Sequence, residues 1–165
     1  MIDYKRVSTE DIPLLVHNRI DLLLDANSLQ DIAALDLVKE QLYQYYTWSI
    51  PTNNHIAYLA FENSLCIGTG GICFYQVLPT YHNPTGRKAY ITNMYTIPEF
   101  RNRGVATHIL DSLVKESLRL GVKFISLEAT ESGRPIYKKY GFVQLNTEMQ
   151  LYNEVFDTHQ NEFHK

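Results

Sequence analysis

Residues 90–106 read YITNMYTIPEFRNRGVA, and this stretch decides the fold of the chain. Residues 89–97 predict a long strand that Pro98 closes. From Val105 onward, apolar residues recur at helical spacing on one stripe until Gly121, a typical residue at a helix C-terminus. The sequence therefore predicts a strand that passes through a short loop into a strongly amphipathic helix.

The loop of this stretch, residues 101–106, predicts an anion-binding site. The first N–H groups of a helix have no partner within the helix, and the helix dipole favours a phosphate there. Gly104 lets the backbone approach a pyrophosphate closely, small Ala106 keeps the first turn uncrowded, and Arg101 and Arg103 add charge. The motif Arg-x-x-Gly-x-Ala is short enough to occur by chance, so its position after a long strand is what favours a phosphate over a merely basic helix start. It fits neither a Walker loop nor a dinucleotide fingerprint.

A second motif lies further along the chain, at residues 133–142, which read GRPIYKKYGF. A short helix over residues 135–140 begins at a proline, ends at Gly141 and enters a strand through Phe142. This pattern predicts local structure and by itself gives Tyr137 no catalytic role.

The other elements follow from periodicity and turn signals. Helices are expected from Ser8 and from about residue 28. Strands are expected over residues 2–7, 55–61, 67–75, 124–129, 142–145 and 149–152. Residues 62–64 predict a hairpin turn, and the glycines of residues 68–71 predict a bulge or bend. The fold class is therefore α/β (α+β), a mixed sheet of six to seven strands flanked by about four helices, in the order β-α-α-β-β-β-α-β-α-β-β.

Composition limits the function classes. The chain has 165 residues, of which 45% are apolar and 20% charged, as expected for one globular domain. We assign this domain to residues 1–152 and a loosely held polar tail to residues 153–165. The net charge of −3 and the lack of long Lys/Arg runs argue against nucleic acid, and no signal peptide or membrane span is predicted. Cys66 and Cys73 are expected to be reduced thiols in a cytoplasmic protein. No metal-ligand spacing occurs, so no metal is expected.

Together, the motifs Arg-x-x-Gly-x-Ala and Tyr-x-x-x-Gly-Phe, each following a strand, resemble the GNAT superfamily of acyl-CoA-dependent N-acyltransferases. The resemblance covers residues 2–152 and implies the GNAT fold, with acetyl-CoA as co-substrate. It implies that backbone groups at residues 94–96 pair with the pantetheine arm and that the N–H groups of residues 101–107 hold the pyrophosphate. The implied cofactor residues are Met94, Tyr95, Thr96, Arg101, Asn102, Arg103, Gly104, Val105, Ala106, Thr107 and Tyr137.

The implied reaction is direct attack of an amine on the thioester, and the resemblance makes Tyr137 the candidate general acid near the thioester sulfur. An ordinary tyrosine lies about 1.5 pKa units above a thiol, so full proton transfer costs ~2 kcal/mol and a strong hydrogen bond is more plausible. For the base, some members use a glutamate on the central strand, whereas residues 89–93 contain no carboxylate. Two candidates stay open: Glu128 on the next strand, and a water relay through Asn93, Thr92 or Tyr90.

The acceptor is expected to be a primary amine of a small molecule or peptide. Asp21, Asp25 and Glu40 would give the acceptor site an acidic rim suited to a cationic amine, or they are only solvated charges. The aromatic cluster around Tyr45 and Trp48 either packs in the core or lines the acceptor pocket. A non-catalytic acyl-CoA sensor is the alternative function, and a homodimer is possible by resemblance.

Overall fold

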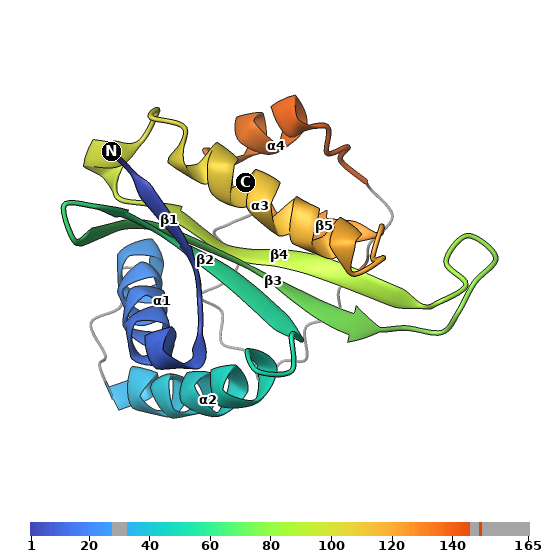
Figure 1. Cartoon of the computed structure of the whole chain (residues 1–165), viewed down its shortest axis with the longest axis horizontal. Helices are drawn as coiled ribbons and strands as arrows, with labels where there is room; N and C mark the ends of the chain where they lie inside the picture. Colours follow the sequence, from blue (N-terminus) through green and yellow to red (C-terminus); the bar gives the residue numbers. More distant parts are fainter. Residues whose placement is uncertain (28–32, 146–148, 150–165) are drawn as a thin grey trace. The chain divides into compact units, whose positions relative to one another are not determined.

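The computed structural model describes residues 1–27, 33–145 and 149. The chain divides into two compact units, Met1–Glu128 and Ala129–Lys165. The first unit is a five-stranded sheet with helices on both faces (Figure 1). The second unit contains one short helix in its described part.

The sheet has the strand order β1-β2-β3-β4-β5. Its strands are β1 (Asp3–Arg6), β2 (His55–Glu62), β3 (Leu65–Gln76), β4 (Arg87–Thr96) and β5 (Ile125–Leu127). Neighbours are antiparallel except β4 and β5, which are parallel. The predicted hairpin turn joins β2 to β3 through Asn63 and Ser64, both with positive φ, as a two-residue hairpin loop requires.

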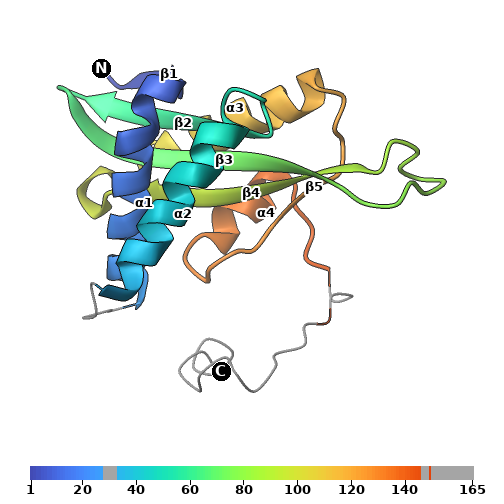
Figure 2. The ribbon, with the colours of Figure 1, turned by 90° about the horizontal axis from the view of Figure 1, so that it is seen from below.

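Helices cover the two faces differently. A 3-10 turn, η1 (Thr9–Asp11), leads into α1 (Ile12–Asn27), which lies with α2 (Ala33–Ser49) on one face, and Figure 2 shows both helices crossing it. The helix α3 (Val105–Arg119) lies on the other face. Apolar side chains from α1, α2 and β2 form a common core, which contains Leu15, Val16, Tyr46, Ile50, Ala57 and Leu59. The start predicted for α2, near residue 28, lies outside the described residues.

The central strand β4 contains a bulge at Asn93. Thr69 of β3 pairs with Tyr95, whereas Gly71 pairs with Thr92, so β4 carries one extra residue at this point. Asn93 takes up the extra length with a left-handed backbone, φ 57°, a conformation that asparagine tolerates better than most residues. The bulge or bend predicted at residues 68–71 is therefore present, but the extra residue lies in β4 and not in β3.

Glycines of β3 let α3 approach the sheet closely. A Cβ on Gly68 would lie 2.7 Å from Val105 Cγ1. A Cβ on Gly70 would lie 2.6 Å from Ile109 Cγ2 and would also overlap Met94 Sδ. Because interiors are close-packed, these two glycines set the depth at which α3 sits.

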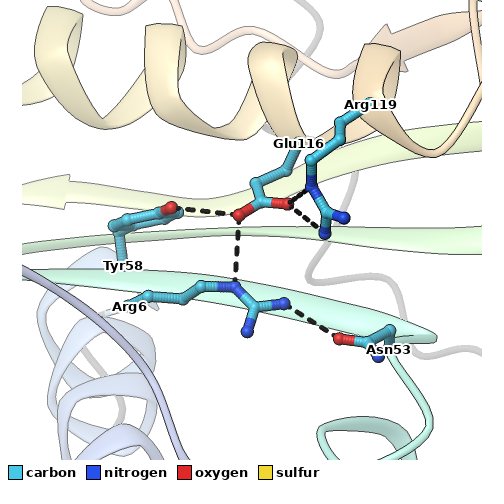
Figure 3. A network of polar contacts seen from close by, with 5 residues as sticks. All are labelled: Arg6, Asn53, Tyr58, Glu116 and Arg119. Carbon is cyan, nitrogen blue, oxygen red and sulfur yellow. Dashed lines mark hydrogen bonds and ion pairs between the residues drawn. The ribbon is translucent and has the colours of Figure 1, made fainter.

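A polar network at the other end of α3 ties it to β1 and to β2 (Figure 3). Glu116 accepts hydrogen bonds from the Tyr58 hydroxyl at 3.3 Å and from Arg119, and it pairs with Arg6 Nε at 3.3 Å. Arg6 also donates to Asn53 Oδ1 at 2.9 Å. Exposed ion pairs contribute little individually, so the network mainly fixes the orientation of α3.

The second unit contains α4 (Arg134–Tyr140), which begins after Gly133 and carries Pro135 in its first turn. It ends at Gly141, whose φ of 117° suits glycine, and the N–H groups of Gly141 and Phe142 both donate to the Tyr137 carbonyl. The predicted helix at residues 135–140 is thus present.

Two predicted strands, residues 142–145 and residues 124–129, differ from the structure. Residues 142–145 are not part of a sheet, because a strand needs a hydrogen-bonded neighbour and none pairs with them in the described part of the chain. Their expected partner, residues 149–152, falls almost wholly outside the described residues. The described sheet therefore has five strands rather than six to seven, and β5 is shorter than the predicted residues 124–129.

Substitution of Gly70 by alanine should destabilise the protein by about 1–3 kcal/mol, because the added methyl group collides with α3 and Met94. Gly70→Val should cost more, and Ser126→Ala, at an exposed position of β5, should be close to neutral. Urea denaturation measures all three. Equal stability of the alanine and valine variants would contradict a steric cause.

Candidate active site

The loop between β4 and α3 has two residues with left-handed backbone. After the 3-10 turn η2 (Pro98–Phe100), Asn102 has φ 61° and Gly104 has φ 83°. A Cβ on Gly104 would meet no atom within 4 Å, so the space above this residue is open. Arg101 holds the loop back against the strand, since its Nε donates to the Thr96 carbonyl at 3.1 Å.

The start of α3 presents free backbone donors. Its first helical hydrogen bond runs from the His108 N–H to the Gly104 carbonyl at 3.0 Å. The N–H groups of Val105, Ala106 and Thr107 therefore have no acceptor within the helix. Val105 is 2% exposed and packs against Gly68, which fixes the direction of these donors. The geometry is that of a helix N-terminus prepared for an anion.

The two arginines of the loop have different surroundings. Arg103 forms a two-pronged ion pair with Glu62, Nη1 to Oε2 at 3.0 Å and Nη2 to Oε1 at 2.5 Å, and its guanidinium lies 5.2 Å from the Phe100 ring centre. The hydrogen bond from Arg103 lowers the pKa of Glu62. Sequence reasoning missed Glu62, because only the hairpin of β2 and β3 brings it to the loop.

Strands β4 and β5 part next to the bulge. They pair at Ala89–Ile125, Tyr90–Ser126 and Ile91–Leu127, and the pairing ends there, just before Asn93. Glu128, the residue after β5, is exposed at this point. Burial raises the pKa of Tyr90, and the charge and side-chain hydrogen bond of Glu128 add to the rise, while a hydrogen bond with the Glu128 backbone opposes it, so Glu128 lies beside the Tyr90 hydroxyl. The structure thus brings together two of the residues considered for proton removal.

Asn93 is buried, with 8% of its surface exposed, and its side chain faces α1. Arg19 Nη1 donates to Asn93 Oδ1 at 3.5 Å. The sequence analysis gave Arg19 no role, since nothing in the local pattern distinguishes it from other helical arginines.

The aromatic residues of α2 divide between core and surface. Tyr46 is buried, and burial raises its pKa to about 12 although the charge of Arg19 opposes the rise. The Tyr45 hydroxyl forms a hydrogen bond with His55 Nδ1 at 3.1 Å, and burial lowers the pKa of His55 to about 4. Trp48 is 58% exposed. The packing interpretation thus holds for Tyr46, whereas Trp48 lies largely at the surface.

Two of the three residues of the predicted acidic rim have partners on their own helices. Asp21 pairs with His17 at 3.3 Å on an exposed helix surface, and Glu40 accepts a hydrogen bond from Gln44. The side chain of Asp25 lies outside the described residues.

Tyr137, in the second unit, lies in the middle of α4 with its ring edge-on to Phe142 at 6.0 Å. Burial raises the pKa of its hydroxyl, so it stays protonated to higher pH than an ordinary tyrosine. Its catalytic role stays a prediction.

The chain matches the family model of the acetyltransferase (GNAT) family over residues 24–142. The chain belongs to this family. A predicted acetyltransferase from Clostridium acetobutylicum, crystallised with acetyl-CoA, is 38% identical, with a TM-score of 0.83 over 92% of this chain and 96% of that one. A GNAT acetyltransferase from Ralstonia eutropha shares the fold at 21% identity, with a TM-score of 0.80 over 93% and 99% of the two chains.

Among curated proteins, the N-alpha-acetyltransferase MAK3 of Arabidopsis thaliana is 28% identical over 105 residues, 62% of this chain. This chain spans about half the length of that curated relative. The predicted family and fold class are therefore confirmed.

Two further observations concern the described residues alone. No group of three or more His, Cys, Asp or Glu side chains there could hold a metal ion. No helix in residues 1–27 or 33–145 has the length and apolar character that crossing a bilayer requires.

Gly104→Asp and Gly104→Asn form a matched pair that tests the anion site. Both add a side chain of the same shape to a left-handed position that Asn and Asp tolerate, so both should fold with similar Tm values. Asp also adds a negative charge at the helix start, which repels a phosphate. Calorimetric titration with acetyl-CoA should show at least about tenfold weaker binding by the Asp variant. Equal affinity of the pair would remove the pyrophosphate from this loop.

Proposed function

We propose that the protein transfers the acetyl group of acetyl-CoA to a primary amine of a small molecule or peptide. The observation that carries this proposal is the position of the α3 N-terminus at the end of β4, the strand that parts from β5 beside a bulge. The strand β4 therefore has an anion site at its end. A few residues earlier it has lost its neighbour β5, so the extended pantetheine arm could pair with it there.

The donor would be held by backbone groups. The N–H groups of residues 105–107 and the charge of Arg101 suit the pyrophosphate, and the open space above Gly104 suits its close approach. The pantetheine arm would pair with β4 at residues 94–96 as an added strand does. Arg103 is already paired with Glu62. It would therefore either hold the loop in place through this ion pair, or leave Glu62 and bind a phosphate of the cofactor.

The chemistry is a direct transfer. The amine nitrogen attacks the thioester carbon, the C–S bond breaks, and the CoA thiolate leaves after a tetrahedral oxyanion collapses. A backbone N–H near Tyr95 would stabilise the oxyanion, and Tyr137 would donate a hydrogen bond to the thiolate. The raised pKa of Tyr137 makes complete proton transfer still less favourable than for an ordinary tyrosine, which supports hydrogen-bond donation.

Glu128 is the stronger candidate for accepting the amine proton. It is exposed at the point where β4 and β5 part, next to the Tyr90 hydroxyl. Asn93, by contrast, is buried, and its Oδ1 already accepts from Arg19, which makes it a poorer member of a water relay.

The proposal is tested by measuring thiol release from acetyl-CoA in the presence of a panel of primary amines. Release that depends on an amine, with an acetylated product of matching mass, is expected. Tight acetyl-CoA binding without thiol release from any amine would instead support a sensor built on this fold.

Tyr137→Phe should lower kcat by roughly 100-fold or more while leaving acetyl-CoA affinity unchanged, because it removes a donor to the leaving thiolate. Since burial raises the Tyr137 pKa, the hydroxyl stays protonated across the neutral and mildly alkaline range. The kcat of the natural protein should therefore show no loss from this group below about pH 10. Unchanged turnover of the variant would remove Tyr137 from the mechanism.

Glu128→Gln should lower kcat/KM by roughly 100-fold at neutral pH, because the amine loses its proton acceptor. The loss should shrink as the pH rises, since more of the acceptor amine is already deprotonated in solution. Glu131→Gln, at another exposed glutamate, serves as the matched control and should keep full activity. An equal loss in Glu128→Gln at all pH values would contradict a role as base.

A further inference from the structure

Arg19 is the feature of the first unit that the proposed transfer chemistry leaves unexplained. It follows the buried residues Leu15 and Val16 by one helical turn on α1, so it points toward the sheet. The residue is half-buried, and its Nη1 reaches Asn93 at the β4 bulge. A cation is thus held at the point where β4 and β5 part.

Three other arginines of the first unit pair with carboxylates, and Arg19 differs from them. Arg103 pairs with Glu62, and both Arg6 and Arg119 pair with Glu116. Among the side chains that the structure describes (residues 1–24 and 35–145), Arg19 has no carboxylate in ion-pair range, and its hydrogen bond there is one contact of 3.5 Å to a neutral amide. A guanidinium has five N–H donors, and leaving them unmatched in a half-buried place is costly.

Two described neighbours of Arg19, Asn93 and Tyr46, are polar and uncharged. Asn93 presents an amide oxygen, and Tyr46 is close enough for the Arg19 charge to act on its hydroxyl. Burial keeps the Tyr46 hydroxyl protonated at neutral pH, so it supplies a dipole and no negative charge. Arg19 is therefore the cation that faces Asn93, whereas Asp21 and Glu40, which could have given the acceptor site an acidic rim, have partners on their own exposed helix surfaces.

We propose that Arg19 binds an anionic group of the acceptor, so that the substrate is a small primary amine carrying a carboxylate or phosphate close to its nitrogen. This inference rests on the proposed acetyl transfer at the β4 bulge. Planar guanidinium donors fit carboxylate and phosphate oxygens in pairs. With the anion on Arg19 next to Asn93, the acceptor nitrogen of a short molecule stays near the same stretch of β4, where the thioester would lie.

This inference differs from the cationic acceptor that an acidic rim of Asp21, Asp25 and Glu40 would suit. A polycationic amine would bring positive charge against Arg19, in a place where burial weakens solvent screening. A small amino acid or a phosphorylated amine would instead neutralise the guanidinium. Arg19 is thus a specificity-determining residue, and the proton removal assigned to Glu128 is independent of it.

The test uses acceptor pairs that differ mainly in the anion: L-methionine with L-methioninamide, and O-phosphoethanolamine with ethanolamine. Thiol release is followed for the natural protein and for Arg19→Gln, Arg19→Lys and Arg119→Gln. Amidation also changes the amine's own pKa, so the deciding quantity is how each variant changes the ratio of kcat/KM within a pair.

Arg19→Gln should lose at least about tenfold in kcat/KM for the preferred anionic compound, mainly through KM, and less than about threefold for its neutral partner. Arg19→Lys should recover part of the loss, and Arg119→Gln, on the far end of α3, should change neither. If the ratio changes in the methionine pair, the anionic group is a carboxylate, and if it changes in the phosphoethanolamine pair, it is a phosphate. A ratio that Arg19→Gln leaves unchanged in both pairs overturns the inference while leaving acetyl transfer intact.

A binding measurement keeps the inference testable without turnover. The Tm of the CoA-bound protein should rise with the anionic compounds, and Arg19→Gln should lose this rise. No rise in the natural protein, or an equal rise in both proteins, overturns the anionic acceptor. Absence of thiol release from every amine, with the Tm rise present and dependent on Arg19, would overturn the transfer activity alone.

Discussion

The bulge at Asn93 is the constraint on which the rest of the first unit depends. One extra residue in β4 forces a left-handed backbone there, and the pairing of β4 with β5 ends immediately before it. Bulges bend a strand and turn its side chains to new directions. Here Asn93 points toward α1 and Met94 toward α3. The bulge therefore determines which side chain of β4 contacts the helix on each face of the sheet.

The helix that follows depends on this strand in turn. Gly68 and Gly70 have no side chains that would hold α3 away, and Val105 and Ile109 fill the space. The first turn of α3 is therefore buried on one side and open on the other, where a Cβ on Gly104 would meet no atom within 4 Å. The direction of the free N–H groups comes from apolar packing and not from the charges of the loop.

The distribution of charge around the site depends on which arginines form ion pairs with carboxylates. Arg103 is neutralised by Glu62 from a hairpin distant in sequence, and its ring contact with Phe100 holds it at the loop. Arg19 reaches only neutral groups within the described residues near β4. The buried, neutral His55 and the protonated Tyr45 and Tyr46 beside it add no charge to this face of the sheet.

The sequence by itself determined the elements and the family, because strand, glycine and helix signals at residues 90–106 and 133–142 are local. It also located the bulge region from its glycines, since such glycines mark close backbone approach. The tertiary structure alone decided the partners: Glu62 for Arg103, Tyr90 for Glu128 and Arg19 for Asn93. It also decided that residues 142–145 form no strand in the described sheet. These outcomes depend on contacts between residues far apart in the chain, which local periodicity does not encode.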